Sequence, residues 1–150
     1  MNARKALNYL VWFIGAYHVA VGVGLMFSTA FQRFAVDVYG ATFDWTVRDV
    51  YFIRIIGSFV FVLGSMALVA SKDALRFWPF VLCYVEFFLL RDINRHLYSQ
   101  ELYDGFSVTP SMNVLTSVVF GVQAVALLVL LWLARKRERE AAGSTKPHMI

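Results

Sequence analysis

The residues best suited to chemistry lie in one stretch of the chain, from Phe77 to Tyr98. This stretch is apolar enough to enter a bilayer, yet it carries the ionisable side chains Glu86, Arg91, Asp92, Arg95 and His96. An ionisable residue inside a membrane is costly, by about 2.5–3.5 kcal/mol on insertion scales. We therefore expect these side chains to face other helices or water rather than lipid.

Arginines define the first candidate site, which would bind a ligand near the outer membrane surface. Its predicted residues are Arg54, Arg91, Asp92, Arg95 and His96. Asp92 can reach Arg95 and His96 along one helix face, whereas Arg91 and Arg95 repel each other unless an anion lies between them. One interpretation is a neutralised ion-pair network that caps the helices. The other is a positively charged pocket for an anionic headgroup, a carboxylate or a semiquinone-like ligand, held by the bidentate geometry that Arg favours.

A second candidate site is a polar layer near the middle of the membrane. At a rise of about 1.5 Å per residue, three polar side chains fall near the midplane of a hydrocarbon core about 30 Å thick, namely His18, Glu86 and Gln123. His18 and Gln123 are candidate hydrogen-bond partners for the Glu86 carboxyl group. Glu86 is then either a satisfied, protonated buried acid or a proton-coupling site.

Several kinds of catalytic site are excluded by the sequence. His18 and His96 differ in depth by about 13 Å, too far apart to ligate one haem iron. The motifs of metalloproteases, serine hydrolases and phosphate-binding loops are absent, and the single Cys83 gives no disulfide framework. We predict no metal site and no resident cofactor, with a quinone or a lipid as the candidate ligand.

The composition indicates the elements that must position these residues. Of 150 residues, 59% are hydrophobic and only 16% are charged, which is too apolar for a soluble domain of this size. Four apolar segments are each long enough to span a bilayer: residues 6–30, 51–71, 77–98 and 112–134. We therefore predict an all-α integral membrane protein, an antiparallel four-helix bundle over residues 1–137 with a flexible cytoplasmic tail over residues 138–150.

The distribution of Lys and Arg predicts the orientation. Most basic residues lie before the first segment, in the turn between the second and third, or after the fourth. By the positive-inside rule, both termini face the cytoplasm of a multi-pass protein in the bacterial cytoplasmic (inner) membrane. The net charge of +4 is explained by these segment ends, so we predict no nucleic-acid partner.

Small residues recur at helical spacing in the first two segments. Gly15, His18 and Gly22 share one face of the first segment, and Gly57 and Gly64 share one face of the second. Small residues allow membrane helices to approach closely. We expect these two faces to pack against other helices.

The second segment, with Arg54 before Gly57 and with Gly64 seven residues later, is followed by the polar end of the third segment and by an Asp104-Gly105 turn. In these features the chain resembles the DoxX-like group of small four-helix bacterial membrane proteins. The matching positions are Arg54, Gly57, Gly64, Arg91 or Arg95, and Asp104-Gly105. The resemblance implies an association with quinone-linked sulfur oxidation or with other membrane redox complexes.

Three function classes follow from these residues. The leading hypothesis is a small, non-catalytic inner-membrane protein that binds a lipophilic or anionic ligand, or serves as accessory subunit of a membrane assembly, with a quinone-linked redox assembly as one candidate. Its expected partners are membrane lipids and either a larger complex or further copies of itself. The first alternative is a proton-coupled small transporter that acts as a dimer through Glu86. The second is a lipid-modifying membrane enzyme with His96 as base and Asp92 as its orienting group.

Overall fold

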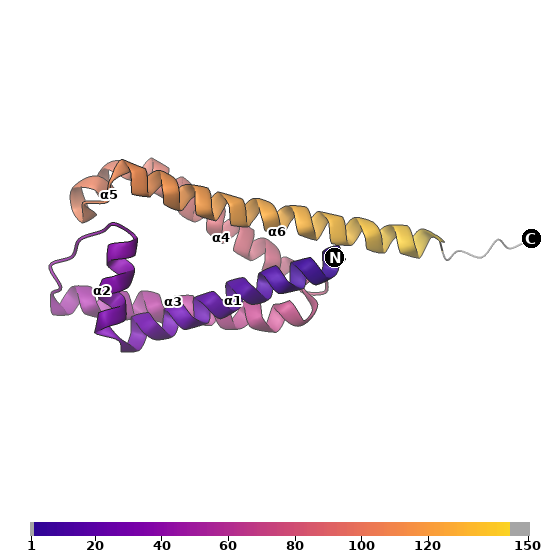
Figure 1. Ribbon diagram of the computed structural model, residues 1–150, viewed down its shortest axis with the longest axis horizontal. Helices are drawn as coiled ribbons and strands as arrows, with labels where there is room; N and C mark the ends of the chain where they lie inside the picture. The colour runs from indigo at the N-terminus through magenta and orange to yellow at the C-terminus, as the bar shows by residue number, and fades with distance from the viewer. Residues whose placement is uncertain (1, 145–150) are drawn as a thin grey trace, which may run out of the picture.

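The structure, a computed structural model, describes residues 2–144, which are helical almost throughout (Figure 1). The described elements are α1 (Ala3–Phe27), α2 (Thr29–Val38), α3 (Val47–Ala70), the 3₁₀ turn η1 (Ser71–Asp73), α4 (Trp78–Leu97), α5 (Ser99–Phe106) and α6 (Pro110–Ser144). No strand occurs within residues 2–144. The predicted all-α class is confirmed.

The long helices lie side by side with their neighbours antiparallel (Figure 1). α1 packs against α3 along its length, α4 packs against α6, and α1 also contacts α6. We call the end where α1 begins and α3 runs into α4 the proximal end, and the opposite end, covered by α2 and α5, the distal end. The later part of α6 extends beyond the other helices at the proximal end.

Three of the described helices are long and apolar enough to cross a membrane. They are α1, α3 together with η1, and the Pro110–Ala141 part of α6. α4 is as long as a spanning helix, but its acidic and basic residues keep it outside this set. The chain thus has the helices of a membrane protein. The transmembrane four-helix bundle, with both termini in the cytoplasm, stays a prediction.

The observed helix bounds differ from the predicted segments mainly at the ends. α4 matches residues 77–98 closely, whereas α6 continues as helix to Ser144 instead of ending near residue 134. Residues 138–144 of the predicted tail are thus helical, and residues 145–150 lie outside the described part of the chain. The short helices α2 and α5 lie almost entirely in the connections between the predicted segments, after the first and after the third segment.

Glycines bring α1 and α3 into backbone contact. A methyl group at Gly64 would lie 2.5 Å from the backbone nitrogen of Val19, and one at Gly22 would lie 2.6 Å from that of Phe61. A methyl group at Gly15 or at Gly57 would lie 2.8 Å from the nearest atom of the facing helix. The close packing predicted from the small-residue faces is confirmed, and only residues without a side chain fit at these positions.

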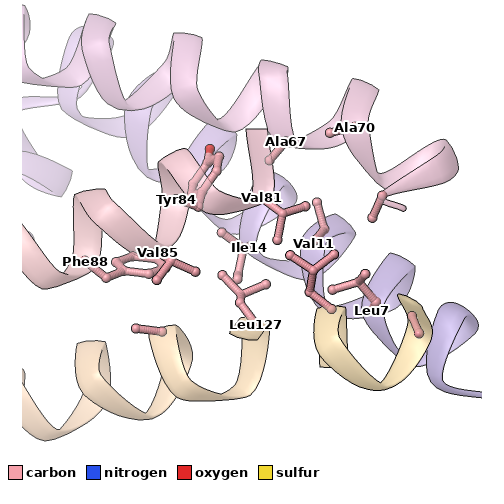
Figure 2. Packing of buried hydrophobic residues seen from close by; sticks show 14 of the residues in the cluster. Leu7, Val11, Ile14, Ala67, Ala70, Val81, Tyr84, Val85, Phe88 and Leu127 are labelled. Atoms are coloured by element: carbon pink, nitrogen blue, oxygen red, sulfur yellow. The ribbon is translucent and has the colours of Figure 1, made fainter. Parts of the chain in front are cut away.

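One apolar core joins all four long helices (Figure 2). It includes Leu7 of α1 and Phe88 of α4, neither of which has exposed surface and which lie toward opposite ends of the cluster (Figure 2). Phe88 stacks on Phe120 of α6 with ring centroids 5.7 Å apart. Ala67 and Ala70 contribute the α3 wall of the same cluster. The two hairpins α1–α3 and α4–α6 are therefore held together by a shared interior.

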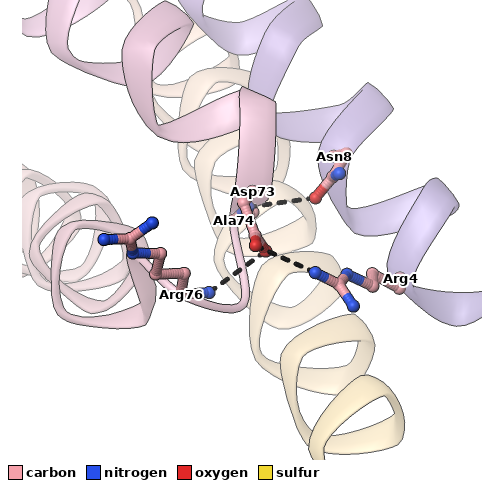
Figure 3. A network of polar contacts seen from close by, with 5 residues as sticks. All are labelled: Arg4, Asn8, Asp73, Ala74 and Arg76. Carbon is pink, nitrogen blue, oxygen red and sulfur yellow. Dashed lines mark hydrogen bonds and ion pairs between the residues drawn. The ribbon is translucent and has the colours of Figure 1, made fainter.

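Polar side chains fasten the start of α1 to the turn between α3 and α4 (Figure 3). Arg4 forms an ion pair with Asp73, with Nη2 and Oδ2 2.9 Å apart. Asn8 Oδ1 accepts a hydrogen bond of 3.0 Å from the backbone nitrogen of Ala74, and Asp73 Oδ1 accepts one from the backbone nitrogen of Arg76. These bonds fix the turn that leads the chain into α4.

The two interactions of this turn should differ in strength. Asn8→Ala is expected to lower the free energy of unfolding by about 1–2 kcal/mol, because it leaves the partly buried Ala74 N–H without its acceptor. Arg4→Ala removes an exposed ion pair and should cost less than about 1 kcal/mol. Titration with SDS from a mild detergent, followed by tryptophan fluorescence, measures both. An Arg4 variant less stable than the Asn8 variant would contradict this ranking.

Candidate functional site

A groove opens at the distal end between α4 and α5. Its volume is about 540 Å³, and its lining mixes apolar side chains with the charged residues Arg91, Arg95 and Glu101. The apolar part includes Phe87, Leu90 and side chains of α5. The groove therefore combines a surface that suits a hydrocarbon with two guanidinium groups at one place.

Aromatic rings hold the side chain of Arg91. Its guanidinium carbon lies 4.2 Å from the ring centroid of Phe120 on α6 and 5.4 Å from that of Tyr39, at the end of α2. These are cation–π distances, and they orient the group without neutralising its charge. Within residues 2–144 no carboxylate forms an ion pair with Arg91.

Arg95 is held by an amide on the neighbouring helix. Its Nε donates a hydrogen bond of 2.9 Å to Oδ1 of Asn113 on α6, and Asn113 is only 2% exposed. The Asn113 amide nitrogen in turn contacts the carbonyl oxygen of Arg95 at 3.5 Å and the hydroxyl of Tyr103 at 3.4 Å. Nη2 of Arg95 is buried and has no acceptor among the described residues. One guanidinium nitrogen of Arg95 is thus left without a hydrogen-bond acceptor in the described chain.

Asp92 forms no ion pair with either arginine of the groove within residues 2–144. Its side chain is half-buried, and Oδ1 has no hydrogen-bond donor in the described chain. The part of the chain that the structure describes contains no ion pair from Asp92 to Arg95 or His96. The ion pairs expected of a neutralised network at Asp92 are thus not formed, and Arg95 donates to Asn113 on α6 instead of to its own helix neighbour.

Three of the five predicted ligand-binding residues do not line the groove, namely Arg54, Asp92 and His96. Arg54 and His96 are both exposed, and within residues 2–144 neither side chain has a hydrogen bond or an ion pair. The structure thus brings Arg91 and Arg95 together in the groove lining and leaves the other three outside it. The sequence analysis missed the contribution of Tyr39, for which no local signal exists.

The predicted mid-membrane layer is not connected by hydrogen bonds. His18 is buried between the rings of Tyr84 and Phe88, and its Nδ1 lies 2.7 Å from the carbonyl oxygen of Ile14. Gln123 is half-buried and Glu86 is exposed, and no hydrogen bond of either is found in residues 2–144. Glu86 lies on the outer side of α4 because its neighbours at 85 and 88 turn toward the core. The predicted hydrogen bonds from Glu86 to His18 and Gln123 are absent there.

The site contains no cluster suited to a metal ion: residues 2–144 include no group of three His, Cys, Asp or Glu side chains in ligating positions. The described residues thus form an all-helical protein with three helices long and apolar enough to span a membrane and with a groove lined by two arginines at one end. No protein-family model, no curated protein and no solved structure matches this chain.

Proposed function

We propose that this chain is a non-catalytic membrane protein that binds an amphiphile through the Arg91/Arg95 groove, the headgroup being anionic or a strong hydrogen-bond acceptor. The observation that carries this proposal is the buried Nη2 of Arg95, which has no acceptor in the described chain. A buried donor on a charged group is expensive to leave unpaired. A ligand oxygen that reached this nitrogen, after a shift of the side chains that cover it, would remove that penalty.

The proposal includes a fourth membrane crossing by α4. α3 ends at the proximal end and α6 begins at the distal end, so the chain between them must run the length of the helices. α4 has 20 residues and is therefore about 30 Å long, which matches the hydrocarbon core. With the basic residues of the proximal end in the cytoplasm, the groove lies near the outer surface of a cytoplasmic membrane.

The groove fits an amphiphile. Its headgroup would accept hydrogen bonds from the planar guanidinium group of an arginine, and its hydrocarbon tail would lie on apolar surface. Arg presents its donors in a rigid plane that matches a carboxylate or phosphate and can equally donate to a quinone carbonyl. Phe87, Leu90 and Leu102 offer apolar surface to the tail. Glu101 also lines the groove and would disfavour a headgroup with more than one negative charge. A fatty-acid carboxylate or a quinone therefore suits the site best.

Replacing Arg95 should weaken this binding. Arg95→Met is expected to reduce affinity at least tenfold, since a hydrogen bond from a charged group contributes about 1.5–3 kcal/mol. Oleic acid and a short-chain ubiquinone are the two probes, each measured by native mass spectrometry of the protein in a mild detergent. Oleate binding alone would identify an anion site, and quinone binding alone would identify a site for a neutral acceptor.

The matched control for this experiment is Arg54→Met. Arg54 is an exposed arginine outside the groove, so its loss removes the same charge without removing a groove donor. The control should bind both probes as the wild type does. Equal affinities of the Arg95 variant and the wild type for both probes would refute the proposed site.

On sequence resemblance alone, we further propose that the chain belongs with the DoxX-like group and serves a quinone-linked membrane assembly as an accessory subunit. A ligand-binding role without turnover agrees with the position of His96, which is exposed and makes no hydrogen bond to Asp92 within residues 2–144. Purification from native membranes, with the copurifying proteins identified by mass spectrometry, tests this. A chain that purifies without any redox protein would count against it.

A further inference from the structure

The outward face of α4 carries a regular seam. Its exposed side chains recur at intervals of four and three residues: Pro79, Cys83, Glu86, Leu90, Ile93 and Leu97. This is the spacing of a left-handed pair of helices, in which each seam residue meets the partner helix. Leu90, Ile93 and Leu97 are 59%, 50% and 70% exposed, so half or more of each side chain is free to contact a partner.

Glu86 is the ionisable residue of this seam, and it lies near the middle of α4. It is exposed, and within residues 2–144 its side chain has no hydrogen bond or ion pair. In a single copy of the proposed topology, its carboxyl group would face acyl chains near the centre of the membrane. That position is unfavourable for either a charge or an unpaired polar group.

We propose that the seam binds a second copy of this chain, α4 against α4 in parallel, with the two Glu86 carboxyl groups hydrogen-bonded to each other. All copies insert the same way round because basic residues concentrate at one end. Parallel helices in register place each seam residue opposite its own copy, so position 86 meets position 86. A carboxyl group both donates and accepts when protonated, which makes it complementary to an identical partner.

This inference rests on the membrane topology of the proposed function and adds a second component to the site. Leu90 belongs both to the seam and to the lining of the groove. A second copy on the seam therefore lies along the open side of the groove. The ligand would then be bound beside the interface between two copies.

The native Cys83 tests the seam directly, because it is the single cysteine of the chain and is exposed one turn before Glu86. Wild-type protein in its own membranes is oxidised with copper–phenanthroline and dissolved oxygen. We expect rapid, near-complete conversion to a disulfide-linked species of twice the 17.1 kDa mass, because paired seam positions lie within disulfide reach. The yield should persist after fusion with excess lipid.

The control carries the cysteine on another lipid-facing surface. In the double variant Cys83→Ser, Val122→Cys, the thiol lies on α6 at a position that is 63% exposed in a single copy. Its cross-linking should be at least tenfold slower than that of the wild type and should fall on dilution with lipid. Equal rates for the two proteins would overturn the proposal.

Variants at Glu86 test the carboxyl pair. Glu86→Gln keeps a donor and an acceptor and should cross-link like the wild type, whereas Glu86→Ala should weaken dimerisation about threefold or more. Wild-type dimerisation in the Glu86→Ala variant would overturn the pairing. Arg95→Met should leave cross-linking unchanged, so failure of the ligand site and failure of the dimer are separate results.

Discussion

Gly64→Ala is expected to lower the free energy of unfolding by about 3 kcal/mol, the upper end of the cost of overpacking. The added methyl group would lie 2.5 Å from the Val19 nitrogen and 2.8 Å from the Gly15 carbonyl oxygen. Both are backbone atoms, so relief requires α1 and α3 to move apart. SDS titration from a mild detergent, followed by tryptophan fluorescence, measures the change.

Gly121→Ala is the matched control. Gly121 also lies in a long apolar helix, α6, but a methyl group there would meet no atom within 4 Å. Since alanine favours the helix by up to about 1 kcal/mol over glycine, this variant should be unchanged or slightly more stable. If both variants lost the same stability, helix propensity rather than close packing would explain the glycines.

Asn113→Leu is the second substitution with a large expected effect, a loss of about 2–3 kcal/mol in the free energy of unfolding. Asn113 Oδ1 is the acceptor for Arg95 Nε, at 2.9 Å. Without it, a second nitrogen of the half-buried guanidinium group loses its partner, since Nη2 already has none in the described chain. Removing one partner leaves the full desolvation penalty of the other. The same SDS titration measures this loss.

Two variants bracket this prediction. Thr116→Val removes a hydroxyl that bonds only to Met112 of its own helix and should cost less than about 1 kcal/mol. Asn113→Asp keeps the acceptor for Arg95 and adds a negative charge, so it should retain stability while weakening oleate binding. If the leucine variant kept wild-type stability, the bond from Asn113 would not be what holds Arg95.

The long helices could be predicted because apolar runs of spanning length have few other outcomes. Glycine spacing predicted close packing of α1 and α3 against other helices, although not that these two helices pack against each other. The short helices α2 and α5 lack such a signal. Ser28 caps α2 by accepting a hydrogen bond from the Phe31 backbone nitrogen, a local interaction inside a mixed segment. The outward position of Glu86 was harder, because in a membrane protein the lipid-facing and core-facing sides of a helix are both apolar.

At the groove, Arg91 and Arg95 stood out because charges are rare in spanning segments. Their partners could not be assigned in the same way. Tyr39, which contacts Arg91, lies 52 positions before it in the chain. Asn113, which accepts from Arg95, is one of several polar residues on α6. Which of them meets an arginine depends on the register of α4 against α6. That register is fixed by the stacking of Phe88 on Phe120, a long-range contact.

The pairing of the long helices into the hairpins α1–α3 and α4–α6 bears on the order in which the helices can pack during synthesis. Everything that α1 and α3 need from each other is already synthesised when α4 emerges, so the glycine-packed pair can form first. α4 is different: Arg95 finds its amide acceptor and Arg91 its nearest ring on α6, which is translated afterwards. In the proposed topology, α4 and α6 therefore enter the membrane as a unit, and a chain halted before α6 would leave two arginines without the contacts that make insertion tolerable.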